Sequence, residues 1–124
     1  MRILLDTNAL LRFAQGWPGM PAAVRQTIAD HRNEVFVSSV SAAEIALKVS
    51  IGILTPLPSP LHELMSLLDL TELPFTIAHA EQLMTLPWHH KDPFDRMLIA
   101  QALVDDLPVV TSDRIFADYG VRVI

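Results

Sequence analysis

Short apolar runs alternate along this chain with longer segments of helical periodicity. The apolar runs cover residues 2–5, 35–37, 73–75, 108–111 and 121–124. Runs of this length are typical of strands, and a run that ends abruptly in polar residues favours a strand buried on both faces. Helical patterns lie between them at 9–13, 21–31, 42–49, 60–70, 76–84 and from 93 onward. This alternation predicts an α/β fold, a three-layer α/β/α sandwich with a mainly parallel central sheet.

The most regular helix signal begins at Asp92. This residue can serve as the N-cap, and Pro93 suits the first helical position because its missing N–H group costs nothing there. Apolar residues from Phe94 to Leu103 recur at helical spacing, so the helix is expected to pack inward. Asp95 falls at the third helical position, where it faces free backbone N–H groups. The segment therefore predicts a carboxylate held at the start of a buried helix.

Two other segments carry specific local expectations. Ser41 is followed three residues later by Glu44, which is the spacing of a capping box at the start of the helix at 42–49. Pro74 lies inside the apolar run at 73–75, and proline cannot donate a hydrogen bond to a neighbouring strand. We therefore expect that run to be an edge strand or the end of a strand.

Length and composition indicate a compact protein. A chain of 124 residues, 51% of them hydrophobic and 19% charged, suits a single domain over residues 1–124. The absence of cysteine excludes disulfides and thiolate metal sites, and favours a reducing, cytoplasmic location. The first apolar run ends after Leu5, which is too short for a signal peptide or a membrane span. We expect no association with a membrane.

The charge balance is acidic, with 9 Lys and Arg residues against 14 Asp and Glu residues and a net charge of −5. This balance argues against a nucleic-acid-binding protein that relies on bulk positive charge. An acidic chain can still act on nucleic acid if clustered carboxylates hold divalent metal ions. The positions of the acids therefore matter more than their number.

Four carboxylates follow the predicted strands or begin the helices after them: Asp6, Glu44, Asp95 and Asp113. In a parallel α/β sheet these places lie along one edge, so we expect the four acids to converge. Clustered carboxylates repel one another unless cations neutralise them, and Mg²⁺ and Mn²⁺ prefer oxygen ligands. One or two such ions can activate water and stabilise the oxygens of an in-line phosphoryl displacement. The pattern predicts phosphodiester hydrolysis.

Each acid also has a purely structural interpretation. Glu44 fits a capping box, Asp95 fits a partner of the helix dipole, and Asp113 fits the cap of a short turn at 114–117. Asp6 is harder to explain in this way, because a carboxylate directly after a buried run is costly unless it is paired or bound to a metal. The joint pattern favours the metal site, since all four acids fall on one predicted edge.

Further polar residues flank the acids and could orient ligands, substrate or an attacking water: Thr7, Asn8, Asp92, Arg96, Thr111 and Ser112. Most of them are also common in turns and caps, and Asp92 is expected to act mainly as the N-cap. His89 and His90 do not complete a zinc site, because adjacent residues rarely chelate one ion and no spaced His or Cys partner is present.

These segments resemble the PIN domain, and in particular the VapC-type toxins of bacterial toxin–antitoxin pairs. The matching motifs are Leu5-Asp6-Thr7-Asn8, Ser41-Ala42-Ala43-Glu44, Asp92-Pro93-Phe94-Asp95-Arg96 with Leu98-Ile99-Ala100-Gln101-Ala102, and Thr111-Ser112-Asp113. The resemblance covers essentially the whole chain, and the motif that begins at Asp92 is its most specific part.

The resemblance implies a PIN-like α/β domain that is a Mg²⁺- or Mn²⁺-dependent endoribonuclease with RNA as substrate. It also implies a homodimer that is silenced by a small antitoxin whose tail lies over the active site. Carried over by motif, the metal-binding and catalytic acids are those at positions 6, 44, 95 and 113. Four basic residues could contact phosphates: Lys91, Arg96, Arg114 and Arg12. Arg96 is expected to point away from the metals, toward a phosphate or a structural carboxylate.

Other functions remain open at this point. A haloacid-dehalogenase-like phosphatase also begins with a strand and an aspartate, but position 8 is asparagine where such enzymes use a second aspartate. A receiver domain needs an acidic pair after its first strand, which Asp6 alone does not provide. A PIN-like RNA-processing nuclease that is not a toxin, and a non-catalytic RNA-binding scaffold, would share the fold.

The helix at 60–70 and the loop at 51–58 carry more apolar residues than one small core obviously needs. These residues could line a groove for an antitoxin helix, contribute to a dimer contact, or simply complete the core.

Overall fold

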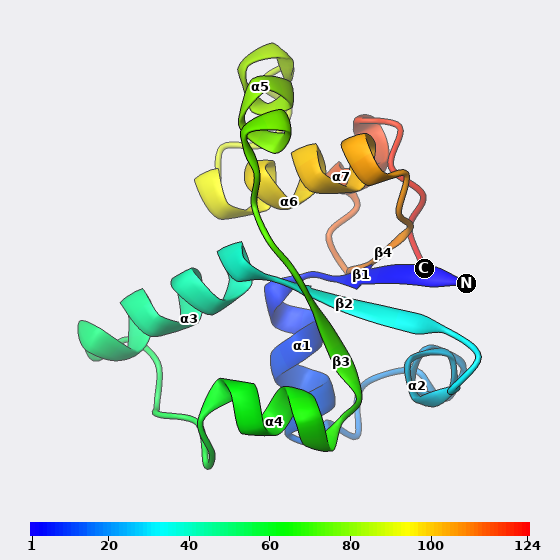
Figure 1. The fold of residues 1–124 in the computed structure, drawn as a ribbon, viewed down its shortest axis with the longest axis vertical. Coiled ribbons are helices and arrows are strands. Elements are labelled where there is room, and N and C mark those ends of the chain that lie inside the picture. The colour runs from blue at the N-terminus through cyan, green and yellow to red at the C-terminus, as the bar shows by residue number, and fades with distance from the viewer.

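A four-stranded parallel sheet forms the centre of the computed structural model, which describes residues 1–124 (Figure 1). Its strands lie in the order β3-β2-β1-β4, and every neighbouring pair is parallel. The strands are β1 (Arg2–Leu5), β2 (Glu34–Ser38), β3 (Leu70–Leu73) and β4 (Val109–Val110). The mainly parallel sheet expected from the alternation of strands and helices is therefore confirmed.

Helices cover both faces of this sheet. The helices are α1 (Thr7–Ala14), α2 (Ala22–Ala29), α3 (Ser39–Ser50), α4 (Leu61–Leu67), α5 (Ile77–Thr85), α6 (Pro93–Asp105) and α7 (Ile115–Asp118). In Figure 1, α1, α2 and α4 lie on one side of the strands, whereas α5, α6 and α7 lie on the other. Helix α3 leaves the end of β2 and extends away from the sheet. This arrangement confirms the three-layer α/β/α sandwich.

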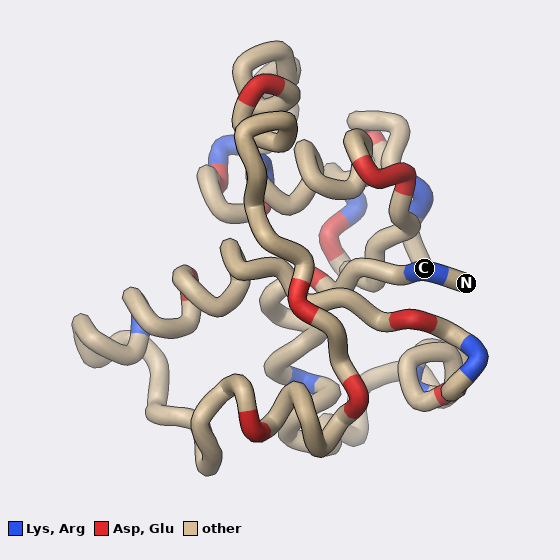
Figure 2. Tube along the Cα trace, in the orientation of Figure 1, with Lys and Arg blue, Asp and Glu red and all other residues tan.

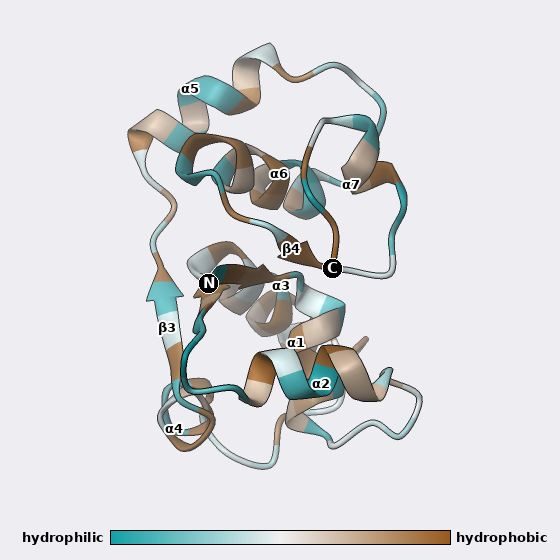
Figure 3. Ribbon diagram, turned by 90° about the vertical axis from the view of Figure 1, so that its right-hand side faces the viewer, coloured by the Kyte–Doolittle hydropathy of each residue, from teal (hydrophilic) through white to brown (hydrophobic).

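Strand β1 supplies side chains to both halves of the core. Leu4 packs into the cluster that α6 and α7 complete, whereas Ile3 and Leu5 pack into the cluster that α1 and α2 complete. All three side chains are fully buried. A strand covered on both faces needs apolar residues at successive positions, which explains the unbroken run at the N-terminus. Figure 3 shows this central hydrophobic band between the two helical layers.

The start of α6 is as expected from the sequence. The Asp92 carboxylate accepts hydrogen bonds from the backbone N–H groups of Phe94 and Asp95, and Pro93 occupies the first turn. By contrast, the capping box of Ser41 and Glu44 is wrong. Helix α3 begins three residues earlier than predicted, at Ser39, and its cap is Ser38, whose hydroxyl accepts from the Val40 N–H group at 2.9 Å. The reason is that β2 runs directly into α3 without a connecting loop.

Three strand boundaries also differ from expectation. Strand β3 spans Leu70–Leu73 rather than 73–75, and it lies at the sheet edge with Pro74 just beyond its end. The helix before it stops at Leu67 because Asp69 adopts a left-handed conformation that turns the chain into β3. Strand β4 is shorter than expected, and the C-terminal segment makes one parallel bridge through Val123 instead of a full strand.

No helix of the protein combines the length and the apolar character needed to cross a membrane.

Candidate active site

The carboxyl edge of the sheet gathers the four acids that the sequence singled out. Asp6 follows β1 and caps α1, where its carboxylate accepts a 2.7 Å hydrogen bond from the Ala9 N–H group. Glu44 lies in the second turn of α3 and Asp95 in the first turn of α6. Asp113 follows β4, and its carboxylate accepts from the Ile115 N–H group.

Asp6 and Glu44 are the most deeply buried of these acids, with exposed fractions of 5% and 6%. Burial raises the pKa of Asp6, and the negative charge of Asp113 raises it further. Hydrogen bonding by the Thr111 hydroxyl and the Ala9 N–H group lowers that pKa in part, as does the charge of Arg12. Asp6 therefore carries a negative charge that its protein neighbours compensate incompletely.

Asp95 shows directly that the acids share one electrostatic environment. Its pKa is raised to about 6, mainly by burial and then by the charge of Asp92, with further increases from Asp6 and Glu44. The charge of His90 acts in the opposite direction. Asp95 therefore lies within electrostatic reach of acids on other elements, and it meets Asp113 at Nε2 of His90, so the structure brings acids from separate elements together.

Two basic side chains, Lys48 and His90, lie among these acids, and no role was predicted for either. The Lys48 ammonium nitrogen is 2.6 Å from a Glu44 carboxylate oxygen. The pKa of Lys48 is raised, mainly by this bond and also by the charges of Asp92 and Asp95. Lys48 follows Glu44 by four residues, which is a spacing for helical ion pairs that could have revealed it.

His90 bridges two of the acids. Its Nε2 atom lies 2.7 Å from Oδ2 of Asp113 and 3.2 Å from Oδ2 of Asp95. Its Nδ1 atom accepts a hydrogen bond from the Asp92 N–H group, which in a neutral ring assigns the proton to Nε2. A metal-bound histidine normally donates its second ring N–H group outward. His90 is thus arranged as a hydrogen-bond donor between two carboxylates rather than as a metal ligand.

The chemistry of this cluster fits a hard divalent cation. One oxygen each of Asp95 and Asp113 lie within 4.8 Å of each other and of Nε2 of His90, so a cation could displace the His90 ring and be held by the two carboxylates. Carboxylate oxygens are the ligands that Mg²⁺ and Mn²⁺ prefer. The raised pKa values of Asp6 and Asp95 indicate negative charge that a bound cation would stabilise.

Several flanking residues hold the acid-bearing segments in place. The Thr7 hydroxyl donates to the Ser41 hydroxyl at 2.9 Å and so links the start of α1 to α3. The Thr111 hydroxyl accepts from the Asp113 N–H group at 3.0 Å and also contacts Asp6. These bonds fix the backbone on which two of the acids are mounted.

The remaining flanking residues differ in exposure and contacts. Asp92 caps α6, as expected, and its charge also acts on Asp95. Asn8 and Ser112 are exposed at this edge of the sheet, where a ligand could reach both side chains.

Arg96 has a different environment from the one expected. Its side chain is buried, and its guanidinium donates to the carbonyl oxygens of Pro87 at 2.8 Å and Leu86 at 3.3 Å. The same group stacks on the Trp88 ring, 3.7 Å from the ring centroid. The expectation of a phosphate or a structural carboxylate as its partner is therefore wrong. Arg96 instead holds the loop that leads to His90.

The raised pKa of Asp95 predicts a pH-dependent stability of the metal-free protein. Between about pH 4 and pH 6 the folded protein binds more protons than the unfolded chain, so the free energy of unfolding falls as the pH rises through this window. In EDTA at pH 7.5, Asp95→Asn is expected to be more stable than the wild type by about 1–2 kcal/mol, after allowance for partial exposure. Urea denaturation at pH 4 and pH 7.5 measures this difference. A gain of equal size at both pH values would contradict the explanation.

Comparisons with known proteins agree with this geometry. The PIN domain family model matches residues 3–121 of the chain. A search of curated proteins finds no match.

Solved structures with similar folds span the whole chain. The structure of VapBC2 from Rickettsia felis, bound to a DNA fragment from its promoter, matches with a TM-score of 0.71 and 18% identity, over 100% of this chain and 98% of that chain. FitAcB from Neisseria gonorrhoeae matches with a TM-score of 0.67 and 25% identity, over 100% and 96% of the two chains. FitAB bound to the IR36 DNA fragment matches with a TM-score of 0.63 and 20% identity, over 100% and 94%.

Proposed function

The chain belongs to the PIN domain family, and we propose that it is a Mg²⁺- or Mn²⁺-dependent endoribonuclease that acts as the toxin of a toxin–antitoxin pair. One observation carries the proposal above all others. Four acids from separate elements meet at the carboxyl edge of the sheet, where burial and then the charges of neighbouring acids raise the pKa of Asp6 and Asp95. Such a cluster is costly to fold unless it serves to bind cations.

In this proposal Asp6, Glu44, Asp95 and Asp113 hold one or two divalent ions. Held by these residues, such an ion would supply a water molecule of lowered pKa and positive charge beside the departing oxygen of the phosphodiester. The protein's own contribution is to keep the acids fixed through the caps of α1 and α6 and through the hydrogen bonds of Thr7 and Thr111. While no ion is bound, Lys48 pairs with Glu44, and the Nε2–H group of His90 donates to the carboxylates at positions 95 and 113.

RNA as the substrate agrees with the distribution of positive charge. Figure 2 shows Lys and Arg spread over the fold rather than gathered on one face. Affinity for nucleic acid through bulk charge is therefore weak, and binding depends on the metal ions and on single basic residues near them. Arg12 is the best placed of these, because it is exposed and its charge acts on Asp6.

A small antitoxin as partner is supported by a groove between α3 and α4. The groove has a volume of about 570 Å³ and includes Ile45, Val49, Leu57 and Leu61 among its apolar lining. An amphipathic helix could place its apolar face there. The similar structures VapBC2 and FitAB are complexes, which favours a protein partner for this chain too. A homodimer is part of the same proposal, and exposed apolar residues such as Ile77 and Met84 of α5 offer a surface for it.

A different PIN-like role remains the alternative to a toxin. An RNA-processing nuclease would share the acids but need no inhibitor, and a non-catalytic RNA-binding scaffold would bind RNA without cutting it. A phosphatase is less well supported because Asn8 stands where a second aspartate would be needed.

The test is an assay of the purified chain on single-stranded RNA with Mg²⁺, with Mn²⁺ and with EDTA. We expect fragments only when a divalent ion is present, and no release of phosphate from small phosphate esters. Phosphatase activity without RNA cleavage would contradict the proposal. The chain is also co-expressed with the product of the reading frame next to it. We expect a complex that contains two copies of the chain by light scattering. This complex should not cut RNA. An active chain that never binds this neighbour would favour the non-toxin nuclease.

A further inference from the structure

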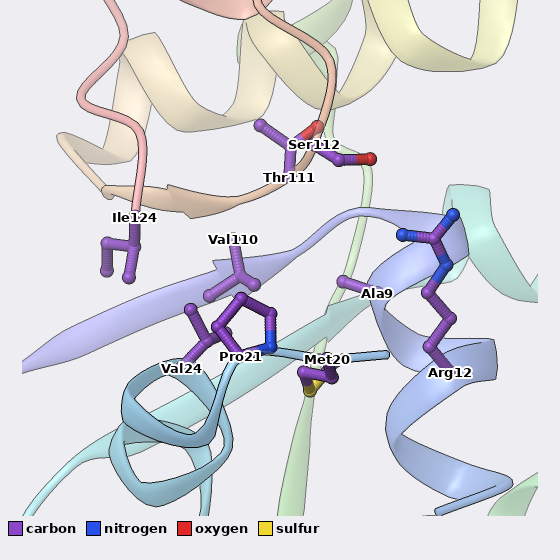
Figure 4. A pocket seen from close by; sticks show the side chains of 9 residues that line it. All are labelled: Ala9, Arg12, Met20, Pro21, Val24, Val110, Thr111, Ser112 and Ile124. Carbon is purple, nitrogen blue, oxygen red and sulfur yellow. The ribbon is translucent and has the colours of Figure 1, made fainter. Parts of the chain in front are cut away.

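A pocket of about 300 Å³ opens beside the acid cluster (Figure 4). Its floor and walls are apolar. They come from Met20, from Val24 of α2, from Val110 of β4 and from Ile124 at the end of the chain. Figure 4 shows these side chains facing one another from different elements, with Arg12 on the other side of the opening. Small-ligand pockets usually have volumes of about 300–1,000 Å³, so this pocket suits a single small ring system.

The polar rim of the pocket belongs to the same segments that carry the acids. Thr111 lines the pocket, and its hydroxyl contacts both the backbone of Asp113 and the carboxylate of Asp6. Arg12 lines the pocket as well, and its charge lowers the pKa of Asp6. A ligand in the pocket would therefore lie directly next to a phosphate bound at the acids.

We propose that this pocket binds an unpaired nucleobase of the RNA, next to the phosphate that is cleaved at the acid cluster. This inference rests on the proposed function and specifies which part of the substrate sets the cleavage preference. Packing the flat face of a base on aliphatic side chains removes apolar surface from water, and sequence-specific RNA recognition targets unpaired bases that are splayed out of the strand. The exposed Ser112 hydroxyl at the rim can hydrogen-bond to the edge of the base.

The positive charge at the rim favours a nucleotide over an apolar side chain of a protein partner. Arg12 presents a guanidinium, which pairs well with phosphate, and the sugar–phosphate chain on either side of the base would pass this position. A protein partner already has a larger apolar groove between α3 and α4. The base pocket and the groove are lined by different residues.

Filling the pocket tests the inference. Val24→Trp places a large ring into the space from α2, and Ile124→Trp does so from the end of the chain, where a folding defect is least expected. Ala23→Trp is the matched control, because it adds the same bulk at an exposed position one residue away on α2. Binding of the four nucleoside 5′-monophosphates and of inorganic phosphate is measured by calorimetry in Mg²⁺. Cleavage preference is measured on a pool of randomised RNA.

We expect at least one nucleotide to bind the wild-type protein roughly tenfold more tightly than inorganic phosphate does, since burial of about 50 Å² of apolar surface of the base contributes about this factor. The two pocket-filling variants should lose this advantage and the preference for one base at the cleavage site, whereas Ala23→Trp keeps both. No nucleotide advantage in the wild type, or an unchanged preference in both filling variants, would overturn the inference. Loss of antitoxin binding with base preference intact would overturn it in favour of a protein occupant. If the wild type binds a nucleotide in the pocket but cuts no RNA, the base pocket stands and the nuclease proposal fails.

Discussion

Asp6→Asn is expected to reduce metal-dependent RNA cleavage by roughly 10³-fold, comparable to the loss of one preorganised charge-stabilising group in other enzymes. Asparagine removes the negative charge but keeps a side-chain oxygen that can accept from the Ala9 N–H group, so the cap of α1 survives. The fold should persist, and the midpoint of thermal unfolding should stay equal or rise, because the buried charge of Asp6 is only partly compensated. Cleavage of a labelled RNA and thermal unfolding measure the two effects.

The control for this experiment is Asp118→Asn, which removes a carboxylate from an exposed position on α7. Its activity and its stability should match the wild type. Full cleavage activity in Asp6→Asn would reject the assignment of Asp6 to the metal site. A collapse of stability in that variant would instead identify Asp6 as a structural cap whose charge is needed.

Arg96→Met is expected to lower the free energy of unfolding by about 3 kcal/mol. Methionine keeps much of the apolar length of the side chain but removes the guanidinium donors to the carbonyl oxygens of Leu86 and Pro87, and only that of Pro87 keeps a second donor, the Tyr119 hydroxyl. It also removes the cation that stacks on Trp88. Urea denaturation measures the change. Arg114→Met at an exposed position is the matched control and should stay within about 0.5 kcal/mol of the wild type.

The same substitution should reduce RNA cleavage indirectly. Arg96 also donates to the Tyr119 hydroxyl at 3.2 Å, and that hydroxyl accepts from the His90 N–H group at 2.8 Å. The loop that presents His90 to the acids therefore loses its support. Arg96→Lys should recover only part of the stability, because an ammonium group cannot reproduce the planar stack or the spread of donors. A methionine variant with full stability and no activity would indicate a direct contact of Arg96 with phosphate instead.

The convergence of the acids could be predicted because it depends on topology alone. Once the strands are parallel, a residue that follows β1 and a residue that follows β4 must lie at the same edge. The cap of α6 could also be predicted, because Asp92 and Pro93 act on backbone groups within one helical turn. Local chemistry and one rule of topology were sufficient for both.

The start of α3 could not be predicted in this way. Ser38, Ser39 and Ser41 are all good cap residues, and nothing in the local pattern chooses between them. The choice is made by packing, because Ser38 is fully buried and hydrogen-bonded to Gln101 of α6. A partner 63 residues away decides where the helix begins.

The prediction for the partners of Arg96 was wrong for a related reason. Its partners are carbonyl oxygens, and every residue has one, so no side-chain pattern marks them. The placement of His90 has the same cause, because its ring meets Asp113 only after β4 and α6 have packed. Lys48 is different, since its four-residue spacing from Glu44 is visible in the sequence and is typical of a helical ion pair.

The contacts among the acids and their neighbours bear on how the metal-free protein folds. Lys48 pairs with Glu44, and His90 contacts both Asp95 and Asp113. Small zinc domains stay unfolded until their metal arrives, because nothing else balances their ligands. Here the chain supplies its own partners for the acids, the Lys48 ammonium and the Nε2–H group of His90, so we expect it to fold before an ion binds. Chelation should therefore leave the circular dichroism spectrum unchanged. Under the proposed function, the ion would control the activity of the protein, whereas folding would proceed without it.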